Sequence, residues 1–466
     1  MQNSYSIIPC SVVCKSGTAD ISNTFSDEVM EIKPFRAFRF SKVVVGDVGS
    51  CISPPYDVIN EIQQQQLYNS NDYNVVRIIK PQSKPSNGQA DNVYTRAAGY
   101  FGDWIKQGAL KQDSAESVYA YVQDFELAGA WFRRFSFIAL GKLEPFGKIV
   151  HPHENTMLGP RKDRLELKKA TAADFGLVFM LYDDPQRIAD DISANKIDDE
   201  PLVDFNDDQN VRHRLFAVTD RDEISAIINM FGDKSCIIAD GHHRYETGLA
   251  YYELTGNPAA QYQMMAFTNT SHEGLIVLAT HRLVSGLEKF SFDDLIGRLK
   301  KDFEVIRFGF DSPDSARKAR HQMFARMKAD YAKDRSCFGI YGGDGAFYVA
   351  KLVNKSQMEK AAPRMSEAWR KLDVTVLSKL VLDRILGITD EKLAGGANVS
   401  YIKDSGSKSK ELVKQIDAGD GQVVFFMNPP KIEHIKAVAD AGERMPQKST
   451  YFYPKVFTGL TIYKLP

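Results

Sequence analysis

The sequence predicts a mixed α/β fold, of the α/β or α+β class, in which helices pack on sheets with both parallel and antiparallel strands. Short apolar runs rich in β-branched residues, which are typical of buried strands, alternate with longer segments that carry apolar residues at helical spacing. Two further pairs of runs flank short glycine-containing turns, at 128–130 and 342–345, and are expected to form antiparallel hairpins. The glycines at 342–345 join two strands and open no helix, so a turn is favoured over a phosphate loop there.

The region before residue 285 is predicted to alternate strands and helices after an N-terminal extension of about 30 residues. Strand segments are recognised by β-branched and aromatic residues, and one helix by Asp220, which can cap its first free amides. The predicted strands cover 74–79, 117–127, 131–143, 177–182, 235–239, 263–268 and 275–283. The predicted helices lie near 163–173, after Asp220 and after residue 242.

Beyond residue 285 longer helices alternate with strands. The predicted helices cover 314–333, 367–386 and 432–443, and a hairpin is predicted within 338–352; the segments 422–427 and 448–464 complete the region. The change of pattern divides the chain into an extension (1–30), an N-terminal α/β unit (31–285) and a C-terminal α/β region (286–466). The last segment of the C-terminal region could return to the site of the first unit.

Charge and apolar patterning exclude several classes of protein. The 466 residues include 59 basic and 60 acidic ones, which leaves no net field to attract nucleic acid or an anionic membrane. No apolar run approaches the roughly 20 residues of a membrane span, and the first residues do not resemble a secretory signal. Five cysteines are too few for a disulfide framework. We therefore expect a cytoplasmic protein without nucleic-acid or membrane partners, in an oligomeric state that the sequence leaves open.

The turn at 237–246 contains more charged and polar residues than core packing requires. An apolar strand ends at Asp240 or Gly241, and a helix begins there. A helix N-terminus attracts anions, because its first amides lack partners and its dipole is positive. Gly241 permits close approach of a ligand, and three donors follow it in the first turn, namely His242, His243 and Arg244. The pattern predicts a phosphate site, in which Arg244 grips oxygens and His243 donates or carries a proton.

Asp240 cannot bind phosphate directly when it is ionised. It is suited to holding Mg²⁺, orienting a histidine or accepting a proton, and its simpler role is that of a helix cap. Adjacent histidines point to different faces of a helix, so His242 and His243 are poorly placed to chelate one zinc ion together.

A second group of polar residues lies at 151–156, where Pro152 stiffens the chain between His151 and His153. Glu154 follows them and could act as a general base, although a polar surface loop would have the same composition. Arg161, just downstream, is the basic residue of its segment best placed to face a phosphate, whereas a solvated helix face is the alternative.

The segment 445–455 combines lysines, hydroxyls and aromatic residues. Lys448, Ser449 and Thr450 are candidates to bind a substrate, and an edge strand with an exposed lysine is the equally plain alternative.

These segments together resemble the family catalogued as domain of unknown function 1015. The resemblance rests on 34–37, 52–59, the His153-Glu154 pair, 239–246 and 445–455, and it extends over almost everything after residue 30. The Asp-Gly-His-His-Arg turn also resembles, over a short span, the signature of free-serine kinases of the ParB/sulfiredoxin fold.

The second resemblance implies a ParB/sulfiredoxin-like nucleotide-binding core, with an additional α/β region at the C-terminus. It implies that residues 241–244 hold the phosphates of ATP or ADP and that Asp240 assists with Mg²⁺ or the acceptor. It also implies that Glu154 is the base that acts on the hydroxyl of a small amino-acid substrate.

Three functions remain open at this point. The first is a nucleotide-dependent kinase that phosphorylates free L-serine to O-phospho-L-serine. The second is a nucleotide-binding switch of the ParB type without small-molecule turnover. The third is a metal-dependent hydrolase that uses the four histidines His151, His153, His242 and His243.

Overall fold

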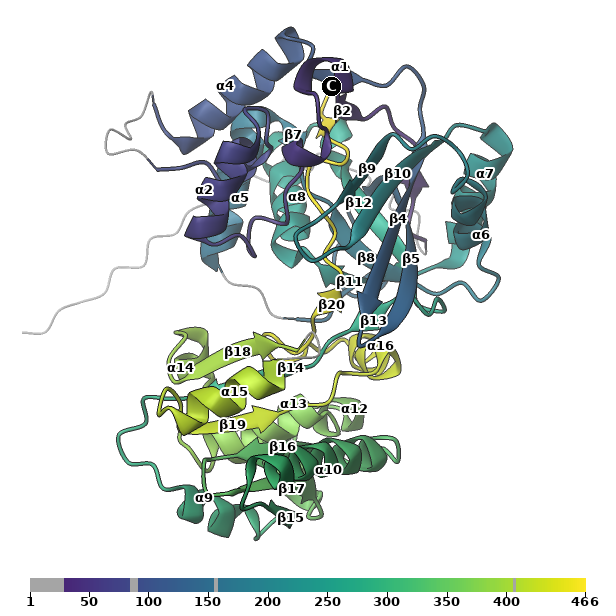
Figure 1. Cartoon of the computed structure of the whole chain (residues 1–466). Coiled ribbons are helices and arrows are strands. Elements are labelled where there is room, and N and C mark those ends of the chain that lie inside the picture. Colours follow the sequence, from purple (N-terminus) through teal and green to yellow (C-terminus); the bar gives the residue numbers. More distant parts are fainter. Residues whose placement is uncertain (1–28, 84–90, 155–157, 405–407) are drawn as a thin grey trace, which may run out of the picture.

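A computed structural model of the chain describes residues 29–83, 91–154, 158–404 and 408–466. The predicted extension (1–30) lies almost entirely outside the described residues. Figure 1 shows two sheets, a large one in the first part of the chain and a smaller one in the second, with the short strands β13 (Ile276–Val277) and β20 (Phe452–Tyr453) between them. None of the described helices is both long and apolar enough to cross a membrane.

The large sheet has nine strands in the order β6-β11-β8-β12-β5-β4-β10-β9, with β1 beside β5. Two neighbouring pairs, β6 with β11 and β8 with β12, are parallel, whereas the other pairs are antiparallel. The predicted mixed α/β fold is therefore confirmed. The strands are β1 (Ile32–Lys33), β4 (Val118–Leu127), β5 (Ala130–Lys142), β6 (Val150–Pro152), β8 (Val178–Tyr182), β9 (Val203–Asn206), β10 (Arg212–Val218), β11 (Cys236–Asp240) and β12 (Tyr262–Asn269).

Helices cover both faces of this sheet (Figure 1). On one side lie α2 (Glu61–Ser70), α4 (Val93–Lys106), α5 (Leu158–Thr171) and α8 (His242–Thr255), and on the other lie α6 (Ile188–Asn195) and α7 (Arg221–Met230). Phe137, Phe231 and Phe267 pack together in the core, and burying each ring stabilises the fold by about 2 kcal/mol. Asp220 caps α7 by accepting from the amides of Asp222 and Glu223, at 2.9 and 3.0 Å, as the sequence predicts.

The smaller sheet is antiparallel throughout, in the order β15-β17-β16-β19-β14-β18. Its strands are β14 (Thr280–Val284), β15 (Phe303–Gly309), β16 (Cys337–Tyr341), β17 (Ala346–Leu352), β18 (Val399–Lys403) and β19 (Val423–Phe426). The helices around it are α9 (Phe292–Leu299), α10 (Pro313–Tyr331), α11 (Ser356–Ala361), α14 (Asp390–Ala394), α15 (Lys408–Asp417) and α16 (Ile432–Asp440). Both predicted hairpins, β4 with β5 and β16 with β17, are present.

After α16 the chain returns to the first part of the molecule. The Met445 amide donates to the carbonyl of His153 at 2.7 Å, and Thr458 exchanges two backbone hydrogen bonds with Ser53. Near its end, β21 (Tyr463–Lys464) pairs with β7 (Ala173–Asp174). The last twenty residues are thus part of the structure around the large sheet.

Three predicted elements are wrong. The segment 275–283 is not one strand: it is divided into β13 and β14, which pair in different sheets. The segment 74–79 is not a strand: it forms the short helix α3 (Val76–Ile79), because the buried Asn74 side chain accepts from the Val76 amide at 2.9 Å and starts a helical turn. The single helix predicted for 367–386 is broken into α12 (Glu367–Arg370), α13 (Asp373–Val376) and a π-helical segment (Leu377–Asp383). The break follows from Leu372, whose backbone is extended.

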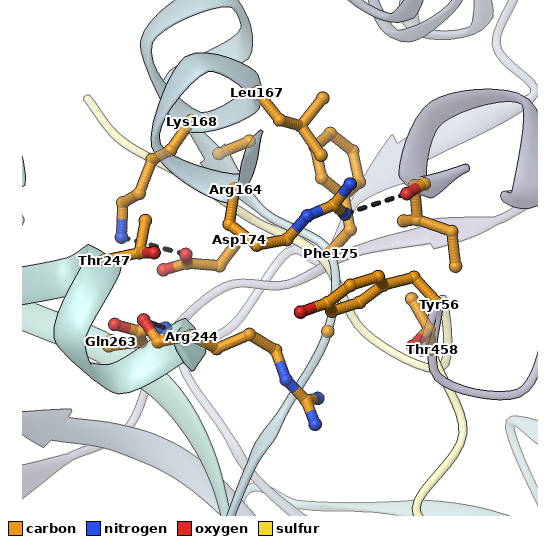
Figure 2. Close-up of a pocket in the computed structure, with 13 residues that line it drawn as sticks. Tyr56, Arg164, Leu167, Lys168, Asp174, Phe175, Arg244, Thr247, Gln263 and Thr458 are labelled. Atoms are coloured by element: carbon orange, nitrogen blue, oxygen red, sulfur yellow. Dashed lines mark hydrogen bonds and ion pairs between the residues drawn. The ribbon is translucent and has the colours of Figure 1, made fainter. Parts of the chain in front are cut away.

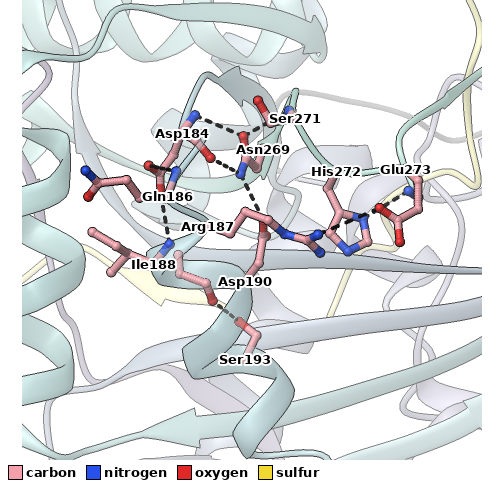
Figure 3. A network of polar contacts seen from close by, with 12 residues as sticks. Asp184, Gln186, Arg187, Ile188, Asp190, Ser193, Asn269, Ser271, His272 and Glu273 are labelled. Atoms are coloured by element: carbon pink, nitrogen blue, oxygen red, sulfur yellow. Dashed lines mark hydrogen bonds and ion pairs between the residues drawn. The ribbon is translucent and has the colours of Figure 1, made fainter.

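A buried polar network fixes the start of α6 against the ends of β8 and β12 (Figure 3). The Asn269 amide nitrogen donates to the Asp184 carbonyl at 2.7 Å and to the Asp190 carboxyl at 2.9 Å. The Asp184 carboxylate accepts from the amides of Gln186 and Ile188, at 3.1 and 2.8 Å. Burial raises the pKa of Asp190 to about 6.

Candidate functional site

The parallel pairing of β6 with β11 brings the two polar groups of the sequence together. Ile238 lies opposite Pro152 in this ladder, so His153 and Glu154 follow β6 beside the point where Asp240 and Gly241 end β11. The two groups are separated by more than 80 residues in the sequence, and only the order of the strands makes them neighbours.

Gly241 is the N-cap of α8 and has a left-handed backbone with φ of 88°. A Cβ at this position would stand 2.9 Å from the Arg244 guanidinium carbon, so close packing also favours glycine. The Arg244 and Tyr245 amides both donate to the Gly241 carbonyl, at 2.9 and 3.0 Å. The amides before them come too early in the helix to have an intrahelical acceptor, and they form the positive end of the helix dipole.

Arg244 folds back beneath the turn. One terminal nitrogen, Nη1, donates to the Leu177 carbonyl, and the other, Nη2, lies 3.4 Å from Asp240 Oδ2. Its Nε is buried without a hydrogen-bond partner among the described residues. Arg244 therefore shapes the turn and still has donor capacity for a ligand.

The C-terminal segment supplies the opposite wall. Lys455 Nζ lies 3.4 Å from Asp240 Oδ2, and Lys448 lines the cavity beside the turn. Burial lowers the pKa of Lys403 to about 8, and the charges of Lys455 and Lys448 contribute to the decrease. A group of cations that repel one another in this way is suited to a polyanionic ligand.

The cavity itself encloses about 590 Å³, part of it open to solvent. It is lined by Tyr56, Asp57, Glu154, Asp240, Gly241, His242, His243, Arg244, Gln447 and Lys448. We call it the turn cavity.

Glu154 is held as an anion at the edge of the turn cavity. Its Oε1 accepts from the Thr450 amide at 3.2 Å and from the Thr450 hydroxyl at 3.0 Å. Burial by itself would raise the pKa of Glu154, but the hydrogen bond with His153, electrostatic interactions with His153 and His242, and the Thr450 amide lower it to about 2. The carboxylate is therefore ionised at neutral pH.

Two histidines meet behind Glu154. His153 is buried, with Nδ1 bonded to the Ile238 carbonyl and Nε2 2.7 Å from the Thr450 hydroxyl. The His242 ring centroid lies 4.9 Å from that of His153, and its Nε2 is buried without a hydrogen-bond partner among the described residues. Burial and the neighbouring His153 lower the pKa of His242 to about 3, so His242 is neutral at pH 7. Burial also lowers the pKa of His243.

The Asp240 carboxylate limits how a metal could bind. Burial would raise its pKa, but Lys455, Arg244 and His242 hold the pKa below its ordinary value. Because Oδ2 already contacts two cations, only Oδ1 is left for Mg²⁺, which would need phosphate oxygens as further ligands. Within the described ranges, no three His, Cys, Asp or Glu side chains converge in a way that could hold a metal ion.

Two predicted site residues lie elsewhere. Arg161 is not among the residues that line the turn cavity, and its carbonyl accepts from the Thr247 hydroxyl on α8 at 3.5 Å. Its side chain was expected to face a phosphate, but the helical turn of α5 presents Arg164 to a cavity instead. Ser449 is buried, and its hydroxyl donates to the Pro446 carbonyl at 2.5 Å, which stabilises its own turn.

Sequence reasoning missed Tyr56, Asp57, Gln447 and Lys455 as site residues. Lys455 belongs to a segment that had been singled out, but no spacing rule connects it to Asp240. The Pro-Pro-Tyr-Asp run at 54–57 was interpreted only as a turn.

A second cavity of about 500 Å³ adjoins the first and shares Tyr56 and Arg244 with it. Figure 2 shows Asp174, Gln263 and Thr247 grouped on one side of this space and Tyr56 on the other. The Arg164 guanidinium lies 4.1 Å from the Tyr56 ring centroid, and Lys168 pairs with Asp174 at 2.9 Å. Asp174 Oδ2 and Gln263 Oε1 are buried acceptors without hydrogen-bond partners in the described structure. We call this space the Tyr56 cavity.

The chain belongs to the family described as "Protein of unknown function (DUF1015)", whose profile matches residues 32–375. No curated protein matches it.

Among solved structures, the chain is similar to a free serine kinase in complex with AMP, at 14% identity and a TM-score of 0.30, over 65% of this chain and 83% of that one. It is also similar to SbnI with a C-terminal truncation from Staphylococcus aureus, at 11% identity and a TM-score of 0.33, over 70% of this chain and 87% of that one. Similarity at this level supports no conclusion about activity.

Proposed function

We propose that this chain is a nucleotide-dependent phosphotransferase that acts on a small-molecule alcohol, with free L-serine as the first acceptor to test. The observation that supports it best is the turn cavity, which an ionised carboxylate, Glu154, lines together with a helix N-terminus and Lys448. Lys455 lies next to this cavity, 3.4 Å from Asp240. Phosphoryl transfer needs this combination, since it depends on positioned phosphates and an oriented hydroxyl. The ParB/sulfiredoxin-like core inferred from the sequence belongs to the same proposal.

In this proposal the phosphates of ATP or ADP bind the first amides of α8, with Lys448 and Lys455 offsetting their charge. The acceptor hydroxyl lies at Glu154. Its oxygen forms a bond to the terminal phosphorus while the bond from that phosphorus to the bridging oxygen breaks. The hydroxyl proton passes to Glu154, and the shortened nucleotide leaves with the bridging oxygen. Mg²⁺, held by Asp240 together with the phosphates, would neutralise part of their charge.

A carboxylate with a pKa of about 2 is a weak proton acceptor at neutral pH. Glu154 therefore acts chiefly by orienting the hydroxyl, and it takes the proton as the new bond forms. A mainly orienting role for Glu154 agrees with phosphoryl transfer in general, which depends on positioning and electrostatic stabilisation more than on covalent chemistry by the protein.

The Tyr56 cavity is suited to the nucleoside. It shares Arg244 with the turn cavity, so one molecule can occupy both. The unpaired acceptors Asp174 Oδ2 and Gln263 Oε1 would receive hydrogen bonds from ribose hydroxyls or an exocyclic amine, and Tyr56 offers an aromatic face.

The decisive experiment measures nucleotide turnover with Mg²⁺, ATP or ADP and a panel of alcohols that includes L-serine. Glu154→Gln should reduce acceptor-dependent turnover by about 10²-fold, because the acceptor hydroxyl is no longer oriented, while nucleotide affinity is retained. Glu166→Gln, which removes a carboxylate paired with Lys169 on the exposed face of α5, is the matched control and should change neither.

The two alternative functions, a nucleotide-binding switch and a metal-dependent hydrolase, predict different results in this experiment. Nucleotide binding without acceptor-dependent turnover would favour the switch. Tightly bound transition metal would favour the hydrolase, although His151 Nε2 lies 3.2 Å from the Lys148 carbonyl and does not join His153 and His242. Absence of nucleotide binding would refute both the kinase and the switch.

A further inference from the structure

A third cavity lies where the smaller sheet meets the C-terminal segment. It encloses about 1310 Å³, part of it open to solvent, and so exceeds both the turn cavity and the Tyr56 cavity. β14 and β18 bound it on one side, the region of α12 to α14 on another, and Pro446 and Gln447 on a third. Figure 1 shows β14 and β18 at the side of the smaller sheet that faces the first part of the chain.

Arg282 is the buried cation of this cavity. Only 4% of the residue is exposed, and its Cζ lies 5.4 Å from the Tyr401 ring centroid. Nη1 donates to the Thr280 carbonyl and Nη2 to the Lys448 carbonyl at 3.2 Å. Among the residues that the structure describes, no carboxylate forms an ion pair with it. A buried guanidinium without a counter-ion is costly, and burial lowers the pKa of Arg282 to about 10.

The other charges in the cavity do not cancel this one. Lys379 is neutralised by Asp390 at 2.6 Å. Arg444 contacts the Phe146 ring at 5.5 Å and, in the described part of the chain, is paired with no carboxylate. Among the described residues the cavity thus has two cations, Arg282 and Arg444, that form no ion pair with a carboxylate, and this favours an anionic ligand.

The remaining wall is largely apolar. Trp369, Met365, Leu382 and Leu393 line it. The part of the cavity that a ligand can occupy is about 510 Å³, within the roughly 300 to 1,000 Å³ of sites for drug-sized molecules, so it has room for a ligand well beyond the size of free serine. A ligand that fits both features carries an anionic group and an apolar body.

The cavity is connected to the proposed site of chemistry. Gln447 lines both this cavity and the turn cavity, and the Lys448 carbonyl that binds Arg282 is two residues from Thr450, which holds Glu154. The charge of Glu154 also acts on both Arg282 and Tyr401, so these side chains lie within electrostatic reach of it.

We propose that this cavity binds the acceptor, and that the acceptor is an organic carboxylate with an apolar body and an alcohol, bound through its carboxylate by Arg282. This inference rests on the proposed function. It assigns the carboxylate to Arg282, the apolar body to the Trp369 wall and the alcohol to the edge at Glu154. The acceptor is accordingly larger than L-serine.

The test uses three probes on the full-length protein without nucleotide. 3-Phenyllactate has the carboxylate, the alcohol and an apolar body, 3-phenylpropionate lacks the alcohol, and 3-phenylpropylamine replaces the anion by a cation. Calorimetry and thermal shift should show binding of both carboxylates and at least tenfold weaker binding of the amine. Equal binding of the amine, or binding of none of the three, would overturn the inference.

Variants locate the site. Arg282→Met should weaken 3-phenyllactate binding at least tenfold. Because Arg282 is buried and this variant could fail to fold, Arg444→Gln is the second variant, and it should weaken binding several-fold. Arg317→Gln, which removes an exposed arginine paired with Asp314 on α10, is the control and should leave binding unchanged. Unchanged affinity in both a folded Arg282→Met and Arg444→Gln contradicts the inference.

Turnover then separates this inference from the proposed function. With nucleotide present, 3-phenyllactate should stimulate turnover with a higher kcat/KM than L-serine. Turnover with L-serine combined with no binding of the carboxylates would refute the acceptor site alone. Carboxylate binding that depends on Arg282, with no turnover for any alcohol, would refute the phosphotransferase and leave the anion site standing.

Discussion

At the scale of the residue, the position of the Glu154 carboxylate depends on hydrogen bonds from Thr450, almost 300 positions away in the sequence. Thr450 donates two hydrogen bonds to Glu154 Oε1, and its hydroxyl also lies 2.7 Å from His153 Nε2. Because the pKa of Glu154 is lowered to about 2 in the fold, its ionisation stabilises the folded state above about pH 4.5, and this contribution is lost as the pH falls toward 2.

Thr450→Val removes the hydroxyl but keeps the shape of the side chain. The pKa of Glu154 should rise, because one of the hydrogen bonds to its carboxylate is lost, so the acidic limb of the kcat/KM profile should move to higher pH. A less well-oriented carboxylate should also lower kcat/KM about tenfold at pH 7, which corresponds to a loss of about 1.4 kcal/mol of transition-state stabilisation. The measurement is a pH profile from 3 to 8. Thr450→Ser keeps the hydroxyl and should retain the original profile; a valine variant with an unshifted profile would show that Thr450 does not set the state of Glu154.

At the scale of the element, the start of α6 shows how a buried carboxyl is tolerated away from the proposed site. Asp190 receives a hydrogen bond from Asn269, and its distance of 3.8 Å from Arg187 makes a loose ion pair. Its raised pKa of about 6 means that the fold binds this proton more tightly than the unfolded chain does. Ionisation of Asp190 therefore lowers the free energy of unfolding: the decrease begins as the pH rises from about 4 through 6 and is fully present above that range.

Asp190→Asn should remove this cost, because an amide oxygen can still accept from Asn269. We expect the free energy of unfolding to rise by about 1 to 2 kcal/mol at pH 8, with the gain disappearing near pH 4. Denaturant unfolding at both pH values measures it. Asp191→Asn, at the exposed neighbouring position, should show little pH-dependent change; a similar gain in both variants would argue against the burial of Asp190 as the cause.

At the scale of the whole molecule, the C-terminal segment is both a structural part of the large-sheet region and a wall of three cavities, since it lines the turn cavity, the Tyr56 cavity and the cavity of Arg282. It contributes Lys448, Thr450 and Lys455 to the proposed site, and β21 pairs with β7. The division of the chain at residue 285 stays a prediction, but the contacts of the last twenty residues with the first part are clear.

A chain that ends at Gly442 should test this dependence. It keeps β6, β11 and α8 but loses the hydrogen bond of Met445 to His153 and the Ser53–Thr458 pair. We expect a lower Tm and loss of nucleotide binding, because Lys448, which lines the turn cavity, and Lys455, which contacts Asp240, are removed with the segment. Calorimetry with and without nucleotide provides the measurement. Nucleotide affinity equal to that of the intact chain would show that the segment is not part of the site.

Local sequence patterns predicted helices and strands correctly where a single sequence feature determined the structure. The alternating runs gave both hairpins, and Asp220 caps α7 because a short carboxylate next to a helix satisfies its first amides. The strand predicted for 74–79 was wrong because two signals conflict there. The β-branched residues favour a strand, but the buried Asn74 side chain starts a helical turn. Arg161 and Ser449 were chosen by residue type, whereas their environments turn them away from the cavity.

The sequence by itself determined that Asp240, Gly241 and the residues after them form a strand-to-helix turn, since that outcome depends on neighbouring residues and on the free amides of one helix. Only the tertiary structure decided what faces this turn. The parallel pairing of β6 with β11 places Glu154 there, and the return of the chain places Thr450 and Lys455. Such contacts join residues separated by up to 300 positions, and their formation depends on strand order and shared burial, which local periodicity does not encode.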